Sequence, residues 1–211
     1  MIVAVSQRVM LLEEVAERRD SLDQRLARWL MSCGLSPAPA SNGLAAVDLE
    51  RWLEVIVPGG VVLSGGNDIG EAPERDETER QLLAYASQRR LPVLGICRGM
   101  QMMAVLAGEE LQRLDGHVRR RHQLVEEPGA VGTWPIEVNS YHQWTLGDCP
   151  RGFAVQVRSS LDQAIEAIRH NALPWEGWMW HPEREVEFSA CDAERAMTLF
   201  KTSVRIEGRS R

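Results

Sequence analysis

Short apolar runs alternate with segments of helical periodicity along the first half of the chain. The apolar runs, bounded by Gly, Pro and polar residues, cover 2–5, 35–40, 61–63 and 92–96. Apolar side chains three or four positions apart, the spacing of an amphipathic helix, mark segments 20–33, 45–55, 76–89 and 100–107. This alternation predicts an α/β fold with a mostly parallel central sheet and helices on both faces.

The connection after the first strand differs from the others. Residues 6–19 are mostly polar and form a long connection, which favours a functional loop. Asp20 is expected to cap the first helix, and Gly34 is placed to end it.

The second half has a different pattern. Short strand-like runs separated by Gly and Pro turns are predicted at 122–125, 135–138, 154–157, 164–169 and 177–180. A closing helix is predicted over about 192–205, followed by a frayed tail at 208–211. Internal repeats and low-complexity linkers are not evident, so residues 1–211 are expected to form one domain.

Composition narrows the class of protein. The chain has 211 residues and a net charge of −6, which disfavours a nucleic-acid partner. Its four cysteines include no CxxC pair, so the pattern suggests neither a metal site nor a disulfide framework. We expect no cofactor, no membrane association because no apolar run is long enough to span a bilayer, and a cytoplasmic location, where a free thiol stays reduced.

The segment around Cys97 carries the strongest chemical signal. Cys97 directly follows the apolar run 92–96, lies between Gly95 and Gly99, and precedes a predicted helix. This arrangement is typical of a nucleophile elbow, a sharp strand-to-helix turn that exposes a reactive side chain. The helix N-terminus favours the thiolate, which is the attacking form. The alternative is a buried core cysteine, a common fate of free Cys.

A cysteine nucleophile needs a base and a group that orients the base. Of five histidines, His181 is the best candidate because it ends an apolar aromatic run and precedes Glu183 by two residues. Glu183 would accept a hydrogen bond from the imidazole and select its tautomer. The alternative is an ordinary histidine at a strand end beside a solvated glutamate.

Other segments offer supporting groups. The loop 64–68 contains Gly66, whose N–H together with that of Arg98 could form an oxyanion hole, although a plain glycine-rich turn is the alternative. Residues 139–143 form a polar and aromatic run suited to a pocket or to an exposed turn. Arginines near the N-terminus and at 119–121 could meet carboxylate or phosphate groups, or simply lie on the surface.

Taken together, these motifs resemble the class I glutamine amidotransferase superfamily, and within it the gamma-glutamyl hydrolase branch. The matching segments are 63–68, 75–79, 95–101, 138–143 and 181–183, in the order of the family. The resemblance spans about residues 2–200 and implies a flavodoxin-like three-layer sandwich. It implies Cys97 as nucleophile, His181 as base and Glu183 as its orienting partner.

The resemblance also implies a substrate site. Gly66 and Arg98 would supply the oxyanion donors, and the glutamyl group would be held by Gln101, Ser140, Tyr141 and His142. One departure is Met179, where family members often carry Gln. The opening segments 6–8 and 17–23 are similar to the gamma-glutamyl-CDP-amidate hydrolases of capsular polysaccharide phosphoramidate synthesis, which makes Arg8 a candidate contact for a nucleotide diphosphate.

The expected activity is hydrolysis of a γ-glutamyl amide through a γ-glutamyl thioester, with a small-molecule substrate such as a γ-glutamyl nucleotidyl amidate or a γ-glutamyl amine. One alternative is a glutaminase subunit that delivers ammonia to a partner synthetase; another is a binding module without activity. A homodimer or a synthetase complex is compatible with the sequence.

Overall fold

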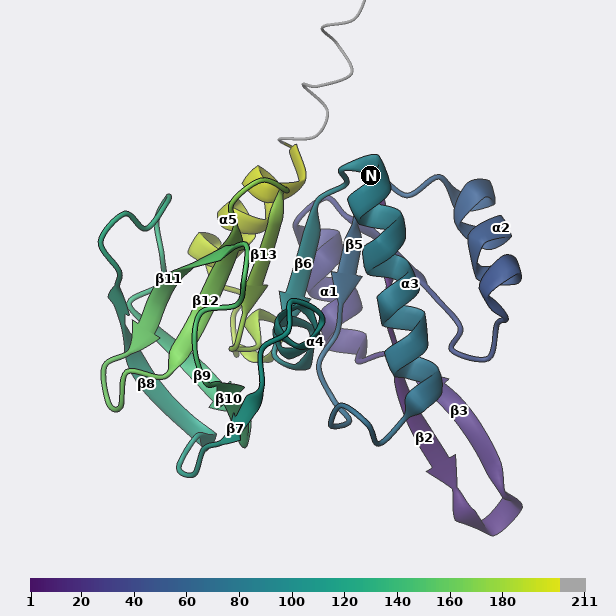
Figure 1. Ribbon diagram of the computed structural model, residues 1–211, viewed down its shortest axis with the longest axis horizontal. Helices are drawn as coiled ribbons and strands as arrows, with labels where there is room; N and C mark the ends of the chain where they lie inside the picture. Colours follow the sequence, from purple (N-terminus) through teal and green to yellow (C-terminus); the bar gives the residue numbers. More distant parts are fainter. Residues whose placement is uncertain (202–211) are drawn as a thin grey trace, which may run out of the picture.

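A nine-stranded sheet forms the centre of the computed structural model, which describes residues 1–201. Its strand order is β4-β1-β5-β6-β13-β12-β11-β8-β9. The first five strands are parallel, and the remaining four join by antiparallel pairing. Helices flank this sheet (Figure 1), so the predicted α/β class is confirmed.

The strands are β1 Ile2–Val5, β2 Arg8–Leu12, β3 Glu17–Ser21, β4 Ser36–Pro39, β5 Val61–Leu63, β6 Val93–Ile96, β7 Leu111–Arg113, β8 Val118–Glu126, β9 Glu137–Tyr141, β10 Trp144–Leu146, β11 Phe153–Ser159, β12 Ile165–His170 and β13 Trp175–Trp178. The helices are α1 Gln24–Ser32, α2 Ala46–Ile56, α3 Pro73–Arg89, α4 Arg98–Leu106 and α5 Ala190–Lys201, with short 3-10 turns η1 Glu13–Val15 and η2 Pro182–Arg184.

Two apolar cores lie on opposite faces of the sheet. Alternate residues of one strand belong to different cores: Val3 and Val5 pack with α1 and α5, whereas Ala4 packs with α2, α3 and α4. The same alternation holds in β5, where Val62 faces away from Val61 and Leu63. Period-two side-chain direction therefore builds a three-layer sandwich from nearly continuous apolar strands.

The N-terminal connection is the main correction to the predicted elements. Instead of a polar loop, residues 8–21 form the antiparallel hairpin of β2 and β3, which extends beyond the sheet (Figure 1). Asp20 lies in β3 and does not cap a helix; its carboxylate accepts bonds from the Asn42 and Ser41 side chains. The cap of α1 is Asp23, which accepts from the Arg25 N–H at 2.8 Å.

Most other predicted elements are confirmed to within a few residues, including β1, β5, β6, α2 and α4. The small strands β7 and β10 were not predicted, because each has three residues and they pair only with each other. The predicted end of the last helix and the predicted frayed tail fall in 202–211, outside the described residues. Within 1–201, no helix combines the length and the apolar character needed to cross a bilayer.

Candidate active site

Cys97 occupies a strained turn between β6 and α4. Its backbone has φ 51° and ψ −105°, a region that costs free energy for a residue with a side chain. The turn is possible because glycines flank it: a Cβ on Gly95 would lie 2.6 Å from the Gly99 carbonyl carbon, and one on Gly99 would strike the Leu63 carbonyl oxygen. The geometry is that of a nucleophile elbow.

His181 reaches Cys97 because β13 and β6 are neighbouring parallel strands. Trp178, at the end of β13, pairs with Ile96, so the residues that follow both strands emerge at one sheet edge. The side-chain amide of Asn139, on β9, holds the His181 backbone by two hydrogen bonds. It accepts from the His181 N–H at 3.0 Å and donates to the His181 carbonyl at 2.7 Å. His181 Nδ1 lies 2.7 Å from Glu183 Oε1, which accepts a hydrogen bond from it.

The Cys97 thiolate and the protonated His181 imidazole stabilise each other as an ion pair. Burial opposes the thiolate, but attraction to His181 and a hydrogen bond with it outweigh burial, so the Cys97 pKa lies below its ordinary value. Burial also opposes a charged imidazole, yet the Glu183 carboxylate and the Cys97 thiolate raise the His181 pKa to about 9. The arrangement therefore favours the thiolate form of Cys97, which is the attacking form.

Alkylation of Cys97 by iodoacetamide is expected to show this pairing. A lowered pKa keeps more of the thiol ionised as pH falls, so the rate should fall at a lower pH than the rate of an ordinary cysteine thiol. His181→Gln removes the positive partner and leaves the burial, so the thiol pKa should rise and the rate profile should shift to higher pH. Mass spectrometry would follow alkylation of the Cys97 peptide. The Cys149 peptide would serve as internal reference, because burial raises the pKa of the Cys149 thiol. Coincident Cys97 profiles in the two proteins would contradict the ion pair.

Gly66 and Arg98 lie at the same edge, held by a buried network of charges. Gly66 has φ +87°. The Arg98 side chain pairs with Asp76 and Glu79, and Arg75 pairs with Glu79 at 3.0 Å. Arg75 also donates to the carbonyls of residues 64, 65 and 66. These bonds orient the peptide groups of the loop that follows β5, including the one that carries the Gly66 N–H.

A cavity of about 380 Å³ opens in front of Cys97. It contains charged groups of both signs: Arg8 and Arg184, and the carboxylates Asp68 and Glu71. Arg8 comes from the start of the hairpin and lies over Gly66, where an added Cβ would meet its guanidinium within 2.5 Å. The other lining residues are Gly66, Asn67, Arg98, Gln101, Val118, Tyr141, His142, Gln143, Trp144 and His181.

The expected substrate residues separate into two groups. Gln101 and Tyr141 line the cavity; Gln101 donates to the Trp144 carbonyl at 3.0 Å, and the Tyr141 ring lies against His181. Ser140 is fully buried, and its hydroxyl lies 3.2 Å from His117 behind the cavity. His142 borders the cavity, but its ring nitrogens face Trp144 and Glu166.

Several cavity residues were not singled out from the sequence. Glu71, Trp144 and Arg184 are separated in the chain, and their only local signal is proximity to the motifs at 64–68, 139–143 and 181–183, whereas Asp68 is the last residue of the 64–68 motif. The Trp144 indole donates to Asp68 at 3.0 Å, and the Arg184 guanidinium lies 4.6 Å from the centre of the Tyr141 ring. Of the other arginines, Arg121 pairs with Glu137 and Glu185.

Comparisons with known proteins agree with this architecture. A family model described as Peptidase C26 matches residues 48–183. The chain is 26% identical to a gamma-glutamyl-CDP-amidate hydrolase of Campylobacter jejuni, over 88% of this chain and 91% of that protein. It is 35% identical to the glutamine-hydrolyzing GMP synthase subunit of Methanothrix thermoacetophila, over 64% of this chain and 72% of that protein.

Among solved structures, a protein described as a GMP synthase subunit from Thermoplasma acidophilum superposes with a TM-score of 0.73. The match covers 99% of this chain and 98% of the other, at 20% sequence identity. At that identity the likeness establishes a shared fold, whereas chemistry depends on the residues of the site.

Proposed function

Because this chain belongs to the peptidase C26 family of class I glutamine amidotransferase-like proteins, we propose that it is a cysteine hydrolase that cleaves a γ-glutamyl amide bond and releases glutamate. The observation that carries the proposal is the charge-matched pair of Cys97 and His181, with Glu183 2.7 Å from the imidazole, at the wall of a polar cavity.

In the first step the Cys97 thiolate attacks the γ-carbonyl carbon of the substrate and forms a carbon–sulfur bond. The carbonyl electron pair moves to oxygen, where the backbone N–H groups of Gly66 and Arg98 would stabilise the charge. Collapse of this intermediate breaks the carbon–nitrogen bond. His181, the proton donor, gives its proton to the leaving amine, and a γ-glutamyl thioester remains on Cys97.

In the second step neutral His181 takes a proton from water, which attacks the thioester carbon. The carbon–sulfur bond breaks, glutamate leaves, and the thiolate and the protonated imidazole are restored. Glu183 keeps the imidazole in the required tautomer and stabilises its charge. A reducing cytoplasm would keep Cys97 available for each cycle.

The cavity suits the zwitterionic end of a glutamyl group. The guanidinium group of Arg184 can pair with an α-carboxylate, and the carboxylates of Asp68 and Glu71 can accept from an α-ammonium group. Gln101 and Tyr141 border the same space.

We favour a γ-glutamyl nucleotidyl amidate, such as γ-glutamyl-CDP-amidate, as the substrate. The similarity to the Campylobacter jejuni hydrolase extends over most of both chains. Arg8, at the base of the hairpin and beside Gly66, would pair with a phosphate on the leaving group.

A glutaminase subunit is the second candidate, favoured by the 35% identity to the glutamine-hydrolyzing GMP synthase subunit of Methanothrix thermoacetophila. In that case the substrate would be glutamine and the released ammonia would pass to a separate synthetase. Such a subunit is expected to turn over glutamine weakly until its partner is added.

Glutamate release from three substrates distinguishes the candidates: glutamine, γ-glutamyl-aminobutyrate and γ-glutamyl-CDP-amidate. Strong turnover of γ-glutamyl-CDP-amidate, with glutamine poor, is the expected result. Turnover of the aminobutyrate conjugate alone would keep the hydrolase and replace its leaving group. Turnover of glutamine alone, or of no substrate in the absence of a synthetase, would favour the glutaminase instead.

A further inference from the structure

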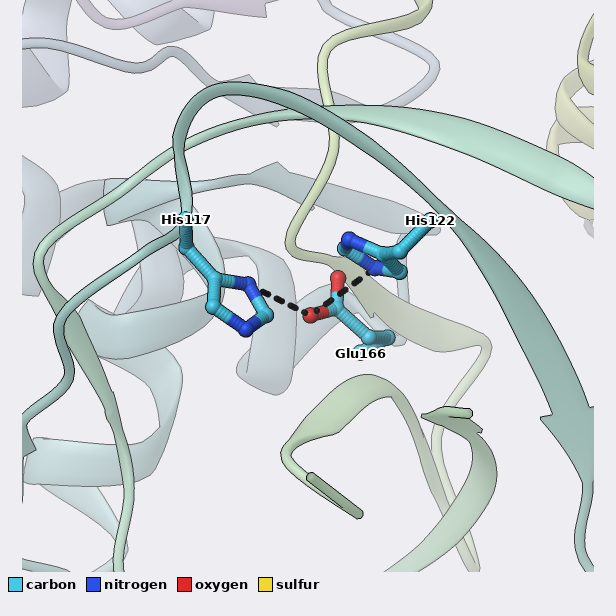
Figure 2. A group of neighbouring side chains, drawn as sticks. All are labelled: His117, His122 and Glu166. Atoms are coloured by element: carbon cyan, nitrogen blue, oxygen red, sulfur yellow. Dashed lines mark ion pairs between the residues drawn. The ribbon is translucent and has the colours of Figure 1, made fainter. Parts of the chain in front are cut away.

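Three buried side chains outside the reacting pair converge behind the cavity. His117 lies just before β8, His122 lies within β8, and Glu166 lies on β12. Figure 2 shows the two imidazoles pointing at the Glu166 carboxylate from opposite sides. All three residues are at least 96% buried, and one potential ligand atom from each lies within 4.8 Å of the others.

Hydrogen bonds within residues 1–201 satisfy His117, through Asp162 and Ser140, but leave His122 and Glu166 unsatisfied. Both carboxylate oxygens of Glu166 and both ring nitrogens of His122 are buried without a hydrogen-bond partner. His122 Nε2 is 3.3 Å from Glu166 Oε1, and His117 Nδ1 is 3.6 Å from it. These distances exceed the usual hydrogen-bond range, and a buried carboxylate without partners is costly.

The positions of the protons on two histidines show which ring nitrogens face Glu166. His117 Nε2 is 2.8 Å from the Asp162 carboxylate, which can only accept, so Nε2 carries a proton. His117 Nδ1 faces the Ser140 hydroxyl at 3.2 Å and Glu166 at 3.6 Å. His142 Nδ1 donates to the Trp144 carbonyl at 3.0 Å, so its Nε2 lone pair also faces Glu166, at 3.5 Å. Lone pairs that converge on a carboxylate are stabilised by a cation between them, which is either a proton on an imidazole or a bound metal ion.

The spacing fits a tetrahedral ion. Zinc bound by imidazole nitrogen and carboxylate oxygen has ligand distances near 2.0 to 2.2 Å, which places its ligand atoms roughly 3.3 to 3.5 Å from one another. The three nitrogen-to-oxygen distances around Glu166 Oε1 are 3.3, 3.5 and 3.6 Å. The charges also match, because the carboxylates of Glu166 and Asp162 together balance a divalent cation.

We propose that His117 Nδ1, His122 Nε2 and Glu166, whose ligand atoms all lie within 4.8 Å of one another, bind a zinc-type divalent ion. His142 Nε2, 3.5 Å from Glu166 Oε1, would complete the ligand set after a small shift toward the two other histidines. Asp162 and the Trp144 carbonyl would orient two of the imidazoles from behind, as partners of metal-bound histidines commonly do. The Ser140 hydroxyl, 3.2 Å from His117 Nδ1, would turn away. With His142 as the fourth ligand the ion would have no open position, so it would stabilise the fold and fix His142 at the edge of the cavity.

Metal content tests the proposal. The full chain, loaded with Zn²⁺ and dialysed, should retain about one zinc per chain and show a higher Tm than the chelated protein. His122→Gln and Glu166→Gln should lose the metal and the Tm shift, whereas His170→Gln, at a half-buried histidine outside the cluster, should retain both.

Two further measurements distinguish zinc bound by the histidine cluster from zinc bound by the Cys97 thiolate. Cys97→Ala should keep the zinc, and Co²⁺ in place of zinc should give an intense visible spectrum without a thiolate charge-transfer band. Even if the cluster variants do not fold, the wild-type stoichiometry and the Co²⁺ spectrum decide the question. Retention of less than about 0.1 zinc per chain, or zinc that Cys97→Ala removes, would overturn the proposal.

Discussion

Replacing Cys97 with alanine is expected to lower glutamate release by roughly 10⁵-fold in kcat, because no other group at the elbow can form the thioester. His181 and the oxyanion donors would remain, so a small residual rate above the uncatalysed reaction is expected. The substitution removes one buried sulfur atom and leaves the flanking glycines unchanged, so Tm should change little. Activity would be measured as glutamate released from whichever of the three γ-glutamyl substrates is turned over fastest.

Cys191→Ala is the matched control, since Cys191 is a half-buried cysteine that lines a different cavity. It should keep activity close to that of the unchanged protein. A Cys97→Ala protein that retains about a tenth of the activity or more would contradict covalent catalysis by this residue.

Replacing Glu79 with alanine is expected to cost about 3 to 5 kcal/mol in the free energy of unfolding, because it leaves two buried guanidinium groups without their shared partner. Glu79 is fully buried and accepts from Ser6 at 2.8 Å, from Arg75 at 3.0 Å and from Arg98. Such a loss is a large share of the stability of an ordinary domain. Urea denaturation would measure it.

Glu77→Ala provides the control on the same helix. The Glu77 side chain is 58% exposed and contacts Arg80 and Gln81 at the surface, so the change should stay within about 0.5 kcal/mol. Equal costs for the two substitutions would show that the buried network does not stabilise the fold. If Glu79→Ala does not fold, Glu79→Gln, which keeps an acceptor oxygen, should be intermediate.

The hydrophobic pattern of short segments was enough to predict most strands and helices of the central sheet and its covering layers. Strands such as β5 and β6 are apolar, short and bounded by turn residues, and helices such as α2 have a clear period, so both could be predicted from sequence. The hairpin could not, because β3 is polar and charged, and β2, an arginine followed by four apolar residues, is mostly exposed. Their pairing comes from long-range contacts, among them the bond from the Val9 N–H to Asn67 at 2.8 Å.

The same division holds at the site. The sequence by itself indicated Cys97 through its glycines and His181 through its place at a strand end, because a tight turn and a strand terminus leave local marks. Only the tertiary structure decided which distant groups meet them: Arg8 over Gly66, and Asp68 beside Trp144. It also turned Ser140 away from the cavity toward His117. The physical reason is that a one-dimensional pattern reports backbone preference and burial, whereas side-chain partners depend on strand order and packing between elements far apart in the chain.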